Sequence, residues 1–254
     1  MDLDVDSAAL CAVYLMTLRL GALLLMTPVF SSLSGLLSVR LLFVLTLSAA
    51  LVAGLGGAPG AVPPLGQLVL ISLAEVATGA VLGFGVFAAF GAFSVAGKIL
   101  DIQSGFALGS VYDPVTRAGA PLFSTMLNLL GVLMFFVLDG HHAMLRGIAF
   151  SLQQAPLGGG FPNFDADAPI RQFGLMFSLG VSLIAPVMVA LFLIEVALAL
   201  LSRVLPQMNV FVVGVPVKIV AALALLALTL RAMGPGMARV YASIFHYWEQ
   251  VLPA

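Results

Sequence analysis

The chain has 254 residues, of which 62% are hydrophobic and only 8% are charged. A soluble globular domain would be about 45 to 50% apolar and about 25% charged. This excess of apolar side chains excludes a freely soluble enzyme, because the surplus must be covered by lipid, by partner subunits or by both. Ten basic and eleven acidic residues leave a net charge of -1, so the chain has no basic field for binding nucleic acid.

Long apolar runs follow one another along the chain. A membrane-spanning helix needs about 20 mostly apolar residues, and about six runs approach this length. The runs lack the alternation of a membrane β-barrel and are longer than ordinary strands. The sequence therefore predicts an all-α fold of polytopic hydrophobic helices in a single domain. The expected helices cover approximately residues 8–26, 39–53, 65–96, 121–138, 170–201 and 215–230.

Glycine and proline mark the expected ends and bends of these helices. The connection 54–64 is rich in both residues and predicts a turn. Pro186 removes one backbone donor from the fifth run, so we expect a kink there. Gly234-Pro235-Gly236 is expected to break the chain after the sixth run. Residues 237–251 then form a short amphipathic tail, whose aromatic and charged side chains suit a membrane surface or a groove between subunits.

The distribution of basic residues does not orient the chain in a membrane. With Arg19 inside the first of six spans, one side holds four basic residues and the other holds five. The positive-inside rule needs a clear excess on one side. Either partners set the topology or the helices do not span a bilayer in the ordinary way.

Several charged side chains lie within or beside the apolar runs. Arg19 is near the middle of the first run, where a charge at the bilayer centre costs about 2.5 to 3.5 kcal/mol. It should have a carboxylate partner or a hydrated cavity, and Glu75 and Glu195 are the available partners, in this chain or in a neighbour. Alternatively, all three lie near helix ends and extend their charges to the surface. Lys98 and Asp101 are three residues apart and would pair if the third helix continues that far.

Glycines crowd the third run. Gly79 and Gly83 have the four-residue spacing that allows two helix backbones to approach closely. Gly97 lies near the end of the same glycine-rich stretch. We expect these positions to mark close helix packing.

The sequence Asp139-Gly140-His141-His142 is the only histidine cluster. Adjacent helical residues point about 100° apart, and the surrounding sequence has no cysteine or acidic set that would complete three or four ligands. The favoured interpretation is a turn that ends the fourth helix. No nucleophile motif, phosphate-binding loop or zinc signature occurs. We therefore expect no metal, no cofactor and no enzymatic activity.

The segment from Gln103 to Pro121 is the most polar stretch in the interior of the sequence. Irregular backbone at membrane depth is tolerated only where it is buried in protein or lines a cavity. If this segment lies deep in an assembly, it should line a pore. If it lies at the surface, it is an ordinary connector, and composition alone leaves both alternatives open.

A series of short motifs runs along nearly the whole chain. They are Arg19 with Pro28-Val29-Phe30, residues 79–93, 96–106, 113–114, 135–142, 203–211 and 214–219. In these motifs the chain resembles the FliR family, the T component of type III secretion export gates, and the resemblance is specific because they occur in family order. Asp139-Gly140-His141-His142 and Gly214-Val215-Pro216-Val217-Lys218-Ile219 look more like the flagellar branch than the injectisome branch. The chain departs from the family by lacking proline within 31–40 and by having Lys98 where glutamate is frequent.

The resemblance implies a structural and gating subunit of a protein export channel in the bacterial inner membrane, within the flagellar basal body. Helical hairpins would assemble with FliP and FliQ homologues, and FlhB and FlhA homologues would complete the apparatus. Residues 1–169 would be a FliP-like front portion, and residues 170–254 a FliQ-like back portion. Unfolded exported proteins would be the substrates, and lipid would cover part of the surface.

The resemblance also assigns candidate site residues. The segment between the third and fourth helices would form a plug at the channel, with Gly105, Phe106, Leu108, Tyr112, Asp113 and Pro114. The candidates for buried charge and assembly are Arg19, Glu75, Lys98, Asp101, Glu195 and Arg203. The candidates for helix packing are Gly79, Gly83 and Gly97.

Three alternatives remain beside the flagellar export gate, and the plainest is a membrane scaffold with no channel role. Another is the corresponding subunit of an injectisome. The third, of a different class, is a small-solute secondary transporter, which the interrupted fifth helix and the charges at Arg19, Glu75 and Glu195 suggest. The absence of two matching halves and the scarcity of polar groups at the centres of the runs argue against a transporter.

Overall fold

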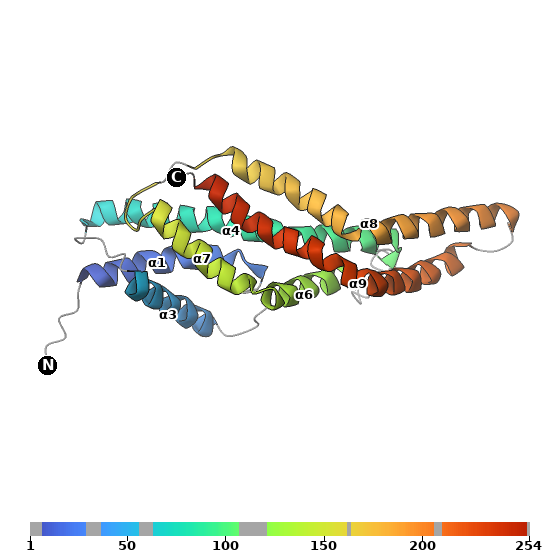
Figure 1. Ribbon diagram of the computed structural model, residues 1–254, viewed down its shortest axis with the longest axis horizontal. Helices are drawn as coiled ribbons and strands as arrows, with labels where there is room; N and C mark the ends of the chain where they lie inside the picture. The colour runs from blue at the N-terminus through green and yellow to red at the C-terminus, as the bar shows by residue number, and fades with distance from the viewer. Residues whose placement is uncertain are drawn as a thin grey trace. The chain divides into compact units, whose positions relative to one another are not determined.

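The computed structural model describes residues 7–28, 37–55, 63–106, 121–161, 164–205 and 210–252. Within these ranges the chain forms seven helices and no strand, which confirms the predicted all-α class (Figure 1). The helices are α1 (Ser7–Leu25), α3 (Leu37–Leu55), α4 (Leu65–Gln103), α6 (Leu122–Val137), α7 (Gly140–Gln154), α8 (Asp167–Val204) and α9 (Val210–Val251).

The number of long apolar helices agrees with the prediction. Five described helices are long and apolar enough to cross a membrane, and the number rises to six if α6 and α7 are taken as one broken span. These two helices meet at a bend of 72°. The predicted turn near Asp139 is therefore present, but a further helix, α7, begins directly after it and is not among the predicted helices.

The predicted break at Gly234-Pro235-Gly236 is wrong. Helix α9 runs through Pro235 without interruption and includes the whole expected tail. Proline removes a single backbone hydrogen bond, and packing on both sides of it can hold a helix together. On the C-terminal side of Pro235, the Tyr241 hydroxyl donates to the Gly131 carbonyl at 2.5 Å. Further along α9, the Trp248 indole donates to the Leu82 carbonyl at 2.9 Å.

The chain divides into two compact units. Unit 1 comprises Met1–Ala88, Asp139–Phe173 and Ala242–Ala254, and unit 2 comprises Ala89–Leu138 and Gly174–Tyr241. Helices α4, α8 and α9 contribute residues to both units. The expected division into a front portion, residues 1–169, and a back portion, residues 170–254, rests on resemblance to two other proteins and stays a prediction.

In unit 1, α1 packs against α3 and against the first part of α4. Gly79 and Gly83 of α4 face the α1 backbone, where an added Cβ at Gly79 would collide with the Arg19 carbonyl. At Gly83 the added atom would lie 3.0 Å from the Leu23 carbonyl oxygen. Glycine therefore permits backbone contact between these two helices.

The core of unit 2 is aromatic. Phe90 and Phe93 of α4, Phe135 of α6 and Tyr241 of α9 are all buried, and their ring centroids lie 5.7 to 6.1 Å apart. Tilted and edge-on ring pairs at these distances add stabilisation to the burial of their area. This cluster joins three helices that are distant in sequence.

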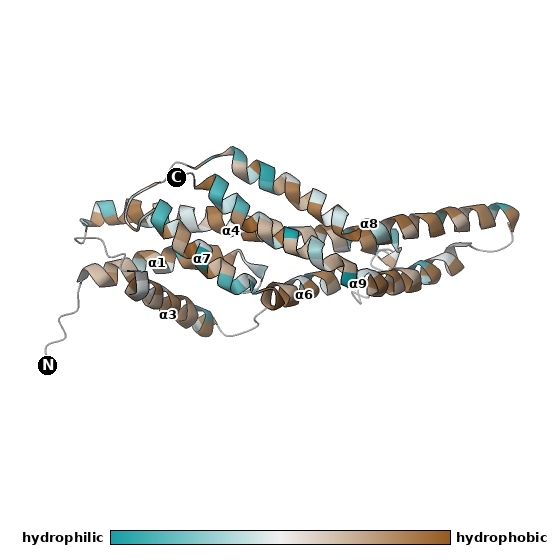
Figure 2. Cartoon of the chain, in the orientation of Figure 1, coloured by the Kyte–Doolittle hydropathy of each residue, from teal (hydrophilic) through white to brown (hydrophobic). Residues whose placement is uncertain are grey.

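Much of the outer helical surface is apolar. Leu25, Leu65 and Leu228 are 79 to 82% exposed, and only 17% of the apolar span of α3 is buried within the chain. Figure 2 shows that hydrophobic residues, coloured brown, make up much of the length of the helices. Such a surface is too large to leave in water, so lipid or neighbouring subunits must cover it.

Candidate functional site

A buried ion pair connects α1 to α4 in unit 1. The Arg19 Nε donates to Glu75 Oε2 at 2.6 Å, and both residues are only 2% exposed. Glu75 is therefore the partner of Arg19, and the alternative that these two charges reach the surface is wrong. A buried pair of this kind is stable only when further hydrogen bonds satisfy both charged groups.

Those further hydrogen bonds come from the end of α7 and the turn that follows it. Arg19 Nη2 donates to the Ala155 carbonyl at 2.8 Å, and Nη1 donates to the Ser151 carbonyl at 3.4 Å. The last carbonyls of a helix lack partners and carry partial negative charge, so a guanidinium satisfies and stabilises them. The Gly158 amide, in a turn with φ of 82°, donates to Glu75 Oε1 at 3.1 Å. One charge pair thus ties together α1, α4 and the end of α7.

A second buried carboxylate organises unit 2. Asp101, in the last turn of α4, is 3% exposed and accepts from the Phe123 amide at 2.9 Å and the Ser124 amide at 3.1 Å. These amides belong to the first turn of α6, whose own N-cap residue, Pro121, provides no side-chain hydrogen bond. Asp101 therefore caps α6 from another helix. Gly97, one turn earlier, permits this approach because an added Cβ would collide with Ser124.

The end of α4 is also fixed where the candidate plug segment begins. Gly105 has φ of 83°, and its amide donates to the Ile102 carbonyl at 3.1 Å. This left-handed position is a frequent way to end a helix. Gln103 Nε2 donates to the Met188 carbonyl of α8 at 2.8 Å. Phe106 is half-buried, while the candidates Leu108, Tyr112, Asp113 and Pro114 lie outside the described residues.

The remaining charged candidates are exposed. Glu195 of α8 lies 3.8 Å from Lys218 Nζ of α9 and has a side chain that is 56% exposed. It is therefore paired with Lys218 rather than with Arg19. Arg203 is exposed in the last turn of α8, where a cation complements the partial negative charge of the helix end. Burial is therefore restricted to Arg19, Glu75 and Asp101 among the six candidates.

The predicted pair of Lys98 and Asp101 does not form. Lys98 is exposed, whereas Asp101 is buried against the start of α6. The three-residue spacing puts both side chains near one face of α4, but α6 covers only part of that face. The Phe123 and Ser124 amides compete with Lys98 for the carboxylate. Buried hydrogen bonds from these amides to a charged group are stronger than an exposed ion pair with Lys98.

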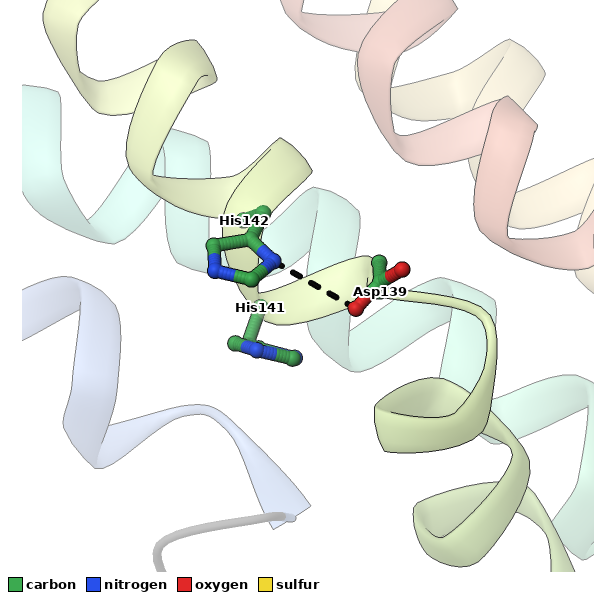
Figure 3. A group of neighbouring side chains, drawn as sticks. All are labelled: Asp139, His141 and His142. Carbon is green, nitrogen blue, oxygen red and sulfur yellow. Dashed lines mark ion pairs between the residues drawn. The ribbon is translucent and has the colours of Figure 1, made fainter.

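The histidine cluster lies at the turn between α6 and α7 (Figure 3). Asp139 has φ of 55°, and its Oδ1 lies 3.4 Å from His142 Nδ1. The His141 and His142 rings lie beside each other, with centroids 4.1 Å apart. The expectation that adjacent histidines diverge does not describe this turn, because both rings and the aspartate occupy one side of it.

The parts of the site that are main-chain groups could not be predicted from the sequence. The carbonyls of Ser151 and Ala155 and the amide of Gly158 complete the Arg19 and Glu75 network. Main-chain groups leave no residue-type signal in a sequence. Among these residues, Gly158 alone lies within a glycine-rich stretch, which is typical of a tight turn.

Comparisons with known proteins agree along most of the chain. The model of the family described as "Bacterial export proteins, family 1" matches residues 10–244. The flagellar biosynthetic protein FliR of Bacillus subtilis is 35% identical over 154 residues, which are 59% of this chain and 60% of that protein. FliR of Aquifex aeolicus is 27% identical over 252 residues, 98% of this chain and 96% of that protein. Yop proteins translocation protein T of Yersinia pestis is 31% identical over 169 residues, 65% of this chain and 64% of that protein.

Proposed function

Because the chain belongs to the FliR family of bacterial export proteins, we propose that it is a structural and gating subunit of the flagellar type III protein export channel. The observation that carries this proposal is the family match over residues 10–244, together with a FliR relative aligned over 98% of the chain. The protein is a non-enzymatic membrane component. It acts by forming part of a passage in the inner membrane, at the flagellar basal body.

We infer that FliP and FliQ homologues cover the apolar outer surface. Helices α3 and α9 bury only 17% of their apolar spans within the chain, which leaves long faces for neighbouring helices. FlhB and FlhA homologues would complete the apparatus, and lipid would cover what the subunits leave exposed. The charged network of Arg19 and Glu75 is already satisfied inside the chain, so it supports assembly by fixing helix positions.

The gating role rests on the segment between α4 and α6. Asp101 holds the start of α6, and Gly105 with Gln103 fixes the end of α4, so the described helix ends on both sides of residues 107–120 are held by hydrogen bonds. A plug built on such anchors seals a passage with bulky side chains, such as Leu108 and Tyr112. Van der Waals contacts exclude water and ions without strong bonds that a passing unfolded chain must break.

Shortening the segment tests the plug. Deletion of residues 108–113 in the full chain should leave assembly intact and raise the ion conductance of the closed gate. Deletion within the connection 56–62 is the matched control and should not change the conductance. Unchanged ion conductance in the first variant would remove the plug role.

The flagellar assignment is tested by complementation. The chain should restore swimming in a flagellated host that lacks its own FliR. Restoration of effector secretion in an injectisome host, without restoration of swimming, would transfer the assignment to the injectisome branch. Gradient-driven uptake of a small solute by the chain alone would instead support the transporter alternative.

A further inference from the structure

The turn between α6 and α7 concentrates metal-binding side chains in a chain that has few of them. Two of the three histidines in the sequence, His141 and His142, lie here beside Asp139. One donor atom from each of these side chains lies within 4.8 Å of the other two (Figure 3). Within the described part of the chain, this is the one group of three such side chains with that spacing.

The distance between two of these donors fits tetrahedral coordination of a small cation. Nitrogen and oxygen ligands lie about 2.0 to 2.1 Å from Zn²⁺, so two ligand atoms of a tetrahedral site are about 3.3 to 3.4 Å apart. The distance from His142 Nδ1 to Asp139 Oδ1 is 3.4 Å. The His141 ring lies alongside, so a rotation of its side chain can bring the third donor to the same point.

The backbone supports this arrangement. Asp139 is the one non-glycine residue with positive φ in the described ranges, at 55°. Such a conformation is unfavourable for most residues and is often found at functional sites. An aspartate at the N-cap of a helix usually binds a backbone amide. Asp139 occupies the N-cap of α7 without a side-chain capping bond, and its carboxylate is directed to the histidine instead.

We propose that Asp139, His141 and His142 bind a divalent transition metal of the zinc class. Imidazole and carboxylate ligands without thiolate suit Zn²⁺ and similar ions. A water molecule or a side chain of a neighbouring subunit takes the fourth position. The side chains of His142 and Asp139 are 62% and 74% exposed, so an ion can reach them. The metal fixes the first turn of α7, where all three ligands lie, a structural role separate from export.

Metal titration of the full chain tests this site. The protein is purified in mild detergent through a tag without histidine, treated with a chelator and titrated with Zn²⁺. We expect one equivalent to bind. His141→Ala and His142→Ala should each weaken binding at least about tenfold. Loss of a group that only supports a metal ligand already lowers metal affinity by about that factor. His246→Ala is the matched control: it removes the remaining histidine, which is exposed on α9, and should leave the affinity unchanged.

Two results would overturn the proposal. One is the absence of one-equivalent binding in the unaltered chain, and the other is equal affinity in the unaltered chain and both histidine variants. X-ray absorption of the unaltered chain with Zn²⁺ gives a measurement that does not depend on whether the variants fold. It should count two imidazole ligands, and a spectrum with one or none would also contradict the site.

Discussion

Replacement of Glu75 by leucine tests whether the buried network holds unit 1 together. The change removes the carboxylate that accepts from Arg19 at 2.6 Å and from the Gly158 amide at 3.1 Å. Leucine fits an apolar interior, but Arg19 remains 2% exposed with its charge uncompensated. We therefore expect strong destabilisation from the remaining charge rather than from a packing defect.

The magnitude follows from the burial. Removal of one partner of a buried ion pair costs about 3 to 5 kcal/mol. One kcal/mol lowers the midpoint of thermal unfolding by about 2 to 4 °C for a chain of this size, so Glu75→Leu should lower it by about 6 to 20 °C. The assay is thermal unfolding of the purified chain in mild detergent, followed by helical circular dichroism.

Two controls separate the charge from other effects. Arg19→Met with Glu75→Leu removes both charges, and it should recover part of the loss, because the Ser151 and Ala155 carbonyls and the Gly158 amide lose their partners but no buried charge remains. Glu195→Leu removes an exposed carboxylate 3.8 Å from Lys218, and it should change stability by no more than about 1 kcal/mol. Equal shifts of the midpoint in Glu75→Leu and Glu195→Leu would show that burial of the Arg19 charge does not set the cost.

Two further substitutions test the close helix contacts. Asp101→Ala removes the acceptors at the start of α6 and should cost about 0.5 to 2 kcal/mol, with faster hydrogen exchange at the Phe123 and Ser124 amides by mass spectrometry. Unchanged exchange there would show that the carboxylate does not cap the helix. Gly79→Ala forces a methyl group against the α1 backbone and should cost about 1 to 3 kcal/mol. Gly21→Ala, with nothing within 4 Å of the added atom, should stabilise α1 by up to about 1 kcal/mol, so equal effects on unfolding would contradict the packing argument.

The helices could be predicted from the sequence because each apolar run is long enough to impose one conformation. The position of Arg19 inside such a run also predicted that it needs a carboxylate partner. Choosing between Glu75 and Glu195 required the tertiary structure, since both lie in similar apolar surroundings. The distance along the sequence carries no information about which helix faces α1.

Other features depended on contacts that local patterns do not encode. Pro235 predicted a break, whereas the packing of Tyr241 and Trp248 holds α9 together on the far side of it. Asp101 appeared to be half of a local pair with Lys98, but the unpaired amides of α6 bind it instead. In both cases long-range packing outweighed a local propensity.

We propose that neighbouring proteins, more than lipid, cover the apolar faces of this chain. The most direct test is native mass spectrometry of the full chain, expressed with its FliP and FliQ homologues and extracted in mild detergent. We expect one stable particle that contains this chain together with both smaller helical proteins. Recovery of this chain as a lone monomer, stable and active in its lipid or detergent shell, would contradict it.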